Sequence, residues 1–138
     1  GLLKLENSVL EPKIVPDAVP VRGCGTFETA DLRVSIRRLE KNQVFYKSFN
    51  TFCVGCDTID MSTCILRTRR TGDRLRLTEH GGSKTLKKLL IDKKIPSARR
   101  DHLAVLADQN GLIAVQGVGI DISRRPQGGA IFEIQFEG

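Results

Sequence analysis

The sequence predicts an α+β fold in which mainly antiparallel strands form a sandwich-like core, with one or two short helices packed against it. Three observations predict this class. Apolar and polar residues alternate over several short stretches, one segment has the spacing of an amphipathic helix, and the tetrapeptide at residues 108–111, Asp-Gln-Asn-Gly, joins two apolar runs as in a tight hairpin. Because 138 residues suffice for one hydrophobic core, we expect one compact unit over residues 1–138.

The first part of the chain, residues 1–56, is predicted to be rich in strands. Leu32, Val34 and Ile36 alternate with polar residues, which is the period of a half-buried strand. A second alternation includes Val44 and Tyr46. Three prolines fit strand edges and connections better than a helix interior: Pro12, Pro16 and Pro20.

The clearest helical spacing lies in residues 83–92, where Ser83 is placed to cap the N-terminus. At about 100° per residue, the leucines of this segment share one face and its lysines share the opposite face. A lysine-rich face is also typical of a plain solvated surface. The residues concerned are Leu86, Leu89 and Leu90, and Lys84, Lys87 and Lys88.

The rest of the chain is predicted to be one more short helix and three strands. Pro96 suits the first turn of a helix that continues to about residue 101. Apolar runs at residues 103–107 and 112–115 flank the hairpin turn, and residues 130–136 form the last strand. We treat residues 57–138 as the second part of the same unit.

Positive charge is concentrated in residues 67–101. The chain has a net charge of +6, and this quarter of it holds 12 of the 22 Lys and Arg residues against four acidic ones. Such a localised field attracts a polyanion, although an acidic protein surface would suit it too. One Tyr and no Trp argue against base stacking, so we expect folded RNA contacted through its backbone. The candidate RNA-binding residues are Arg67, Arg69, Arg70, Arg74, Lys84, Lys87, Lys88, Lys94, Arg99 and Arg100.

Other motifs do not assemble an active site. Cys53 and Cys56 have the C-x-x-C spacing of a zinc site, but reduced thiols packed on strands are the favoured interpretation. Residues 80–85, His-Gly-Gly-Ser-Lys-Thr, lack the glycine before lysine that a P-loop requires. Neither His80 nor His102 has a partner placed for nucleophilic catalysis. We therefore expect no catalytic residue and no metal ligand in this chain.

The absence of an apolar run of roughly 18 residues, and of a signal-peptide pattern, predicts no membrane partner and a cytoplasmic location. The first residue is Gly1 and not Met, which suggests either an expression fragment or the remnant of a tag.

Three ordered motifs resemble the C-terminal domain of bacterial tRNA(Ile)-lysidine synthetases. They are Arg67-Thr68-Arg69-Arg70-x-Gly72-Asp73-Arg74, Gly82-Ser83-Lys84-x-Leu86-Lys87, and Ile91-Asp92-x-Lys94-Ile95-Pro96-x-x-x-Arg100-Asp101. The likeness covers roughly half of the chain, and Thr71 and Leu77 stand where the family usually has proline. The resemblance implies a fold similar to a domain of the phenylalanyl-tRNA synthetase β subunit.

The resemblance also implies a parent enzyme that uses ATP to attach lysine to the wobble cytidine of tRNA(Ile). The family's ATP site is an S-G-G-x-D-S loop in an N-terminal domain, and that hexapeptide does not occur in these 138 residues. No cofactor is therefore expected in this chain, with ATP bound in the parent's N-terminal domain. The implied partner is tRNA(Ile), with a possible homodimer formed through the parent enzyme. The alternative is a non-catalytic RNA- or protein-interaction module.

Overall fold

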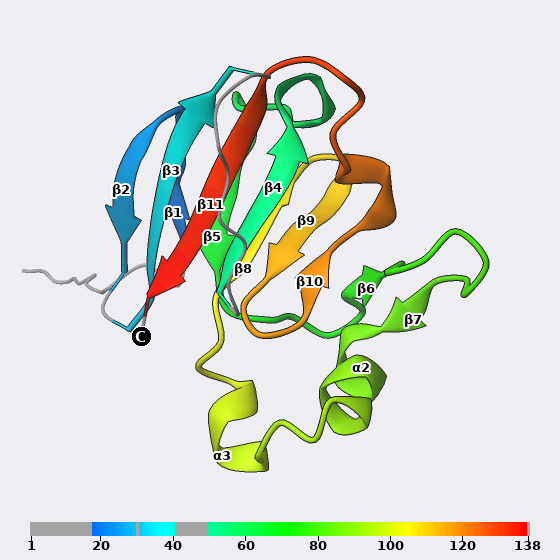
Figure 1. Cartoon of the computed structure of the whole chain (residues 1–138). Helices are drawn as coiled ribbons and strands as arrows, with labels where there is room; N and C mark the ends of the chain where they lie inside the picture. Colours follow the sequence, from blue (N-terminus) through cyan, green and yellow to red (C-terminus); the bar gives the residue numbers. More distant parts are fainter. Residues whose placement is uncertain (1–17, 30, 41–49, 138) are drawn as a thin grey trace, which may run out of the picture.

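A computed structural model describes residues 18–29, 31–40 and 50–137 of the chain. The expected strand around Val44 and Tyr46, and the prolines Pro12 and Pro16, lie outside these residues. In the described part, two antiparallel sheets stack face to face, as Figure 1 shows. The first sheet has the order β1 (Ala18–Pro20), β5 (Ile65–Arg67), β8 (Val105–Asp108), β9 (Gly111–Val115), β10 (Gly119–Ile120). The second has the order β2 (Gly25–Glu28), β3 (Arg33–Leu39), β11 (Ile131–Glu137), β4 (Thr51–Gly55).

A smaller layer lies beside the five-stranded sheet. It consists of a two-stranded sheet and two short helices, namely β6 (Arg74–Leu75), β7 (Lys84–Thr85), α2 (Leu86–Asp92) and α3 (Ser97–Arg100). Two 3-10 turns, Cys56–Thr58 and Ile122–Arg124, complete the described structure. The predicted α+β class with a sandwich-like core is confirmed. Neither α-helix in the described residues has the length and apolar content needed to cross a membrane.

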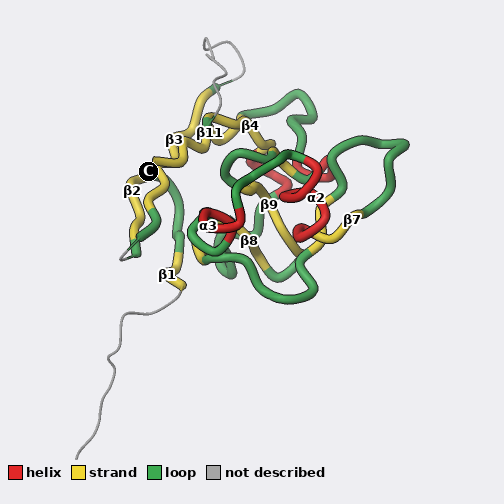
Figure 2. The backbone as a smooth tube through the Cα atoms, turned by 90° about the horizontal axis from the view of Figure 1, so that it is seen from below, coloured by secondary structure: helices red, strands yellow, loops and turns green. Residues whose placement is uncertain are grey.

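The five-stranded sheet is covered on both faces, and β8 and β9 each contribute side chains to both cores. Leu106 packs into the cluster between the two sheets, together with residues such as Ile113 and Ile134. Val105 and Ala107 pack on the opposite side, where the leucines of α2 cover the sheet. Figure 2 shows α2 and α3 lying over β8 and β9. Burial on both faces explains why residues 103–107 form an uninterrupted apolar run.

The last strand joins distant parts of the sequence into one sheet. β11 lies between β3 and β4, with Ile134 opposite Ile36 on one side and opposite Phe52 on the other. The predicted strand at residues 130–136 is thus confirmed as β11. The hairpin predicted around residues 108–111 is confirmed as β8 and β9, with Gly111 at a φ of 125°.

The predicted start of the helix is wrong. The helix begins at Leu86, and the Thr85 hydroxyl accepts a hydrogen bond from the Lys88 N–H at 3.2 Å. Lys84 lies on β7, because residues 84–85 pair with residues 74–75. Ser83 is not the cap, since its hydroxyl and carbonyl oxygens accept hydrogen bonds from the Arg74 guanidinium. The burial of the three leucines Leu86, Leu89 and Leu90 is confirmed.

The connection from α2 to α3 contains a left-handed residue that is not glycine. Lys94 has a φ of 58°, and the Ile95 N–H donates to the Leu90 carbonyl at 3.0 Å. This is the Schellman arrangement that ends many helices, with the apolar side chain of Ile95 packed against the second core. Pro96 is the residue that precedes α3 and not part of its first turn, which corrects its predicted position by one residue.

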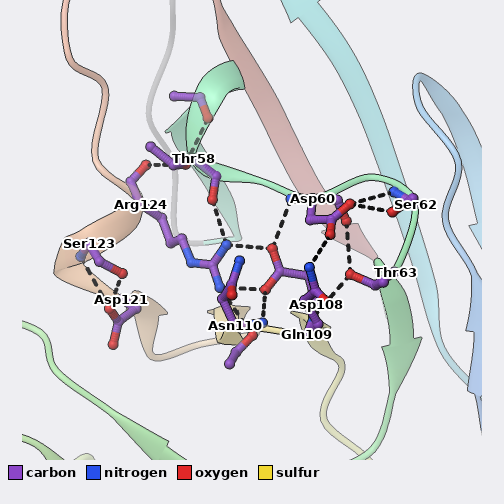
Figure 3. Close-up of polar contacts among 12 residues, drawn as sticks. Thr58, Asp60, Ser62, Thr63, Asp108, Gln109, Asn110, Asp121, Ser123 and Arg124 are labelled. Atoms are coloured by element: carbon purple, nitrogen blue, oxygen red, sulfur yellow. Dashed lines mark hydrogen bonds and ion pairs between the residues drawn. The ribbon is translucent and has the colours of Figure 1, made fainter.

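A buried ion pair joins the hairpin turn to the 3-10 turn at Ile122–Arg124 (Figure 3). The Arg124 guanidinium donates to both carboxylate oxygens of Asp108, at 2.6 and 2.7 Å. The Asp108 carboxylate also accepts the backbone N–H groups of Asp60 and Asn110, each at 2.9 Å. The exposed fractions of the two charged side chains are 3% for Arg124 and 0% for Asp108. Both oxygens of the Asp108 carboxylate therefore accept hydrogen bonds from protein groups, which replace the water molecules that would solvate them in an exposed position.

This pair predicts a loss of stability in acid. Burial by itself raises the pKa of Asp108, but the hydrogen bonds from Arg124 and from the two backbone N–H groups outweigh it and hold the pKa below its ordinary value of 3.8. A carboxyl group with a lowered folded-state pKa stabilises the fold above the unfolded-state pKa, and that contribution is lost as the pH falls through the folded-state pKa. We expect the urea midpoint to be flat near neutral pH and to fall below about pH 4. A midpoint that rises on acidification would contradict the assignment.

The four cysteines differ in their surroundings. Cys24 is exposed, Cys53 and Cys56 are half-buried, and Cys64 is buried in the first core, where burial raises the pKa of its thiol to about 12. Only Cys64 therefore matches the expectation of a buried thiol. Among the described residues, no group of His, Cys, Asp and Glu is placed to hold a metal ion.

Candidate nucleic-acid interface

A surface depression of about 490 Å³ lies where the turn after β5, the start of α2 and the residue after α3 meet. We call it the basic depression. The turn contributes most of the lining, and α2 contributes Lys87 at its first turn. The lining residues are Arg69, Arg70, Thr71, Gly72, Asp73, Thr85, Leu86, Lys87 and Asp101.

The wall of the depression is held by a bidentate ion pair between Arg67 and Asp73. The two guanidinium nitrogens of Arg67 donate to the two carboxylate oxygens of Asp73 at 2.8 and 2.9 Å. The Arg70 N–H donates to the same carboxylate at 2.7 Å, and the Leu86 N–H donates to the Asp73 carbonyl at 2.8 Å. Asp73 therefore fixes both the turn and its position against α2. Asp73 is thus a structural residue that also orients the neighbouring Arg67.

The electrostatics of Asp73 are those of an ion-paired carboxylate. Burial alone raises its pKa, but the hydrogen bonds from Arg67 and the Arg70 N–H, together with the positive charge of both arginines, lower it below the ordinary value of 3.8. Asp73 is therefore ionised at neutral pH. Each of the two side chains is 9% exposed, so Arg67 lies inside the turn and supports the depression without facing solvent.

Two cations of the depression face solvent, and their side chains form no ion pair within the described residues. They are Arg70 and Lys87, which are both exposed. Arg69 is 27% exposed, and its Nη2 lies 3.0 Å from the Asp101 carboxylate, which is 75% exposed. A phosphate entering the depression would therefore meet two free cations and one that is already paired.

The remaining candidate residues lie outside this depression. Arg74 and Lys84 belong to the two-stranded sheet, and exposed Lys94 lies between the helices. Lys88 faces solvent and forms an ion pair with Asp92 one turn further along α2, with its Nζ 3.8 Å from the carboxylate. The Arg100 Nε donates to the Ile95 carbonyl at 2.9 Å, so this half-buried side chain also closes the turn between the helices.

Arg99 lines a different cavity, of about 150 Å³, with Leu103 and Gln116 among its other walls. The basic run thus contributes Arg69, Arg70 and Lys87 to one depression and spreads its other cations over neighbouring surfaces. The sequence interpretation missed Asp101 as a lining residue. Asp101 reaches the depression through its ion pair with Arg69, which is 32 residues away in the sequence. No local sequence pattern predicts a contact over that separation.

The stacked sheets, the helical layer and the turn that Asp73 holds define a domain of a known class. A family model described as "TilS substrate C-terminal domain" matches residues 64–132, which is half of the chain, and the chain belongs to this family. The crystal structure of a TilS C-terminal domain superposes with a TM-score of 0.73 at 22% identity, covering 88% of this chain and 95% of that one. The resemblance to lysidine synthetases is confirmed.

Relatives of named function are similar to this chain over shorter stretches. The tRNA(Ile)-lysidine synthase of Bacillus subtilis is 44% identical over 48 residues, which are 35% of this chain and 10% of that protein. The bifunctional protein TilS/HprT of Listeria innocua is 37% identical over 84 residues, 60% of this chain and 13% of that protein. The synthase of Symbiobacterium thermophilum is 42% identical over 64 residues, 46% of this chain and 13% of its own length. The chain therefore spans a small part of these relatives.

Proposed function

We propose that this chain is the tRNA-binding C-terminal part of a tRNA(Ile)-lysidine synthase, whose whole enzyme uses ATP to join lysine to the wobble cytidine of tRNA(Ile). The observation that carries the proposal is the combination of family membership with the two unpaired cations of the basic depression, Arg70 and Lys87. The Arg70 N–H and the Leu86 N–H both donate to Asp73, so the turn that carries Arg70 and the start of α2 that carries Lys87 are held in a fixed frame. A fixed frame suits contact with the backbone of a folded RNA.

The proposal divides the work of the enzyme between domains. The S-G-G-x-D-S loop that the resemblance associates with ATP is absent from this sequence, so we assign neither ATP binding nor the ligation step to this chain. By analogy with the family, the role we assign to it is to hold the body of the tRNA while another domain acts on the anticodon. Arg suits bidentate contact with a phosphate, whereas Lys acts as a mobile point charge. Arg70 and Lys87 provide one of each.

The test is a double variant, Arg70→Ala with Lys87→Ala, measured by titration of a tRNA(Ile) transcript. We expect affinity to fall roughly tenfold, and the slope of log affinity against log salt to become shallower by about 1.5, because two phosphate contacts are lost. The matched control is Arg33→Ala with Arg38→Ala, which also removes two exposed positive charges but from β3 on the other sheet.

Three outcomes decide the proposal. A loss confined to the Arg70 and Lys87 variant supports contact at the basic depression. An equal loss in the β3 control would mean that only net charge matters, and would contradict a defined site. Failure of the unaltered chain to bind tRNA, combined with binding to an acidic protein surface, would favour the protein-interaction alternative.

A further inference from the structure

The hairpin formed by β6, β7 and their connecting loop projects away from both sheets. We call residues 74–85 the basic arm. Figures 1 and 2 both show the loop extending outward beyond β7. Leu75 and Leu77 anchor the base of the arm in the second core, whereas residues 78–85 are all exposed. The arm therefore has a buried root and a polar outer end.

The root of the arm is held rigidly by polar contacts as well. The Arg76 N–H donates to the Asp121 carboxylate at 2.8 Å, and the Ile122 N–H donates to the Arg76 carbonyl at 2.7 Å. Across the arm, the Arg74 guanidinium donates to the hydroxyl and carbonyl oxygens of Ser83, at 3.0 and 2.8 Å. These contacts use only the backbone of Arg76. Its side chain remains at the exposed surface.

The charge of the arm is positive. It carries Arg74, Arg76 and Lys84, and its one acidic residue, Glu79, forms an ion pair with Arg125 outside the arm. None of these three cations lines the basic depression, so the arm is a second, separate group of positive charges. Arg76 was also absent from the RNA-binding candidates chosen from the sequence.

The outer end of the arm has little side-chain bulk. Gly82 has a φ of 69°, a conformation that favours glycine, and a Cβ on Gly81 would lie 2.4 Å from the Thr78 hydroxyl. Exposed backbone and the polar side chains of Thr78, Glu79, His80 and Ser83 make up the remaining surface. A narrow polar end of this kind can approach the shallow minor groove of an RNA double helix, which displays ribose 2′-hydroxyl groups between two rows of phosphates.

We propose that the basic arm lies across the minor groove of double-helical RNA. In this arrangement Arg76 and Lys84 contact phosphates beyond those at the basic depression, and the outer end hydrogen-bonds to 2′-hydroxyl groups. The proposal rests on the proposed function, because it assigns a second contact to the same RNA. It also gives the chain a way to distinguish RNA from DNA, which phosphate contacts alone do not provide.

The first experiment measures how many RNA phosphates the arm contacts. The complete chain and its Arg76→Ala with Lys84→Ala variant are titrated with an RNA duplex of about 16 base pairs over a range of salt concentrations. We expect the variant to lower the magnitude of the salt slope by about 1.5, as two lost phosphate contacts should. The Arg33→Ala with Arg38→Ala variant, which removes the same charge from β3, is expected to keep the original slope.

The second experiment measures the 2′-hydroxyl contacts. Residues 79–82 are replaced by an Asn-Gly turn, which shortens the arm and leaves Thr78, Ser83 and Arg76 in place. We expect the shortened chain to lose the preference for the RNA duplex over a DNA duplex of the same sequence. Urea unfolding of each variant checks that the fold is intact, and the side-chain variant tests the arm even if the shortened chain does not fold.

The outcomes separate this inference from the proposed function. Suppose that the arm variants bind RNA as the unaltered chain does, while Arg70→Ala with Lys87→Ala weakens binding. The inferred RNA contact of the arm is then overturned, and the proposed function stands. If the β3 control changes the salt slope as much as the arm variant does, the change in slope results from net charge alone. The inferred RNA contact of the arm is then overturned as well. If the unaltered chain binds no RNA, both proposals fail.

Discussion

Replacing Asp108 with alanine is expected to lower the free energy of unfolding by about 3–5 kcal/mol, the loss typical of a buried ion pair that is deprived of one partner. The side chain is fully buried and accepts four hydrogen bonds, two from Arg124 and one each from the Asp60 and Asn110 N–H groups. Removing the carboxylate leaves a guanidinium in the interior without its counter-charge. Since small domains are stable by roughly 5–15 kcal/mol, much of the total stability is at stake.

The measurement is equilibrium unfolding in urea, with Asp101→Ala as the matched control. Asp101 also pairs with an arginine, but its side chain is 75% exposed, and a solvated pair of this kind contributes roughly 0–1 kcal/mol. The double variant Asp108→Leu with Arg124→Met removes both charges and should be less destabilised than Asp108→Ala alone. A loss below about 1 kcal/mol for Asp108→Ala would show that the pair is not the structural tie described above.

This ion pair marks a limit of prediction from sequence. The turn that contains Asp108 was predicted, because Asp, Asn and Gly in sequence specify a tight hairpin by local conformation alone. The partner of Asp108 is Arg124, which lies 16 residues further along and has no periodic relation to it. Local preference therefore predicts the hairpin, whereas the tertiary contact depends on where a second turn returns to the sheet.

The same distinction explains the helix and its charges. The spacing of Leu86, Leu89 and Leu90 predicted the buried face, because helical geometry alone sets which residues align. The start of the helix was misplaced because pairing of residues 84–85 with residues 74–75 is a non-local contact. Charge counting placed Arg67 among the surface cations, yet its side chain points into the turn. Composition gives the sign of a surface field but not the direction of each side chain.

Replacing Asp73 with asparagine is expected to lower the free energy of unfolding by roughly 3 kcal/mol, measured in urea. The carboxylate accepts hydrogen bonds from the Arg67 guanidinium and from the Arg70 N–H, so both of its oxygens are in use. An asparagine amide would direct its own N–H donors toward one of these donors. The substitution leaves Arg67 without a counter-charge while it is only 9% exposed.

The effect of Asp73→Asn on RNA binding has a sign that distinguishes positioning from charge. The substitution raises the net charge of the chain by one, so a purely electrostatic role predicts tighter binding. If Asp73 instead holds the turn that presents Arg70, affinity for tRNA should fall about fivefold, or ~1 kcal/mol, at a temperature where the variant remains folded. Asp101→Asn is the control, because Asp101 lines the same depression but is exposed and holds no backbone N–H in the described residues. Removing that carboxylate should raise affinity. Tighter binding by both variants would overturn the positioning role of Asp73, because removal of either negative charge would then have the same effect.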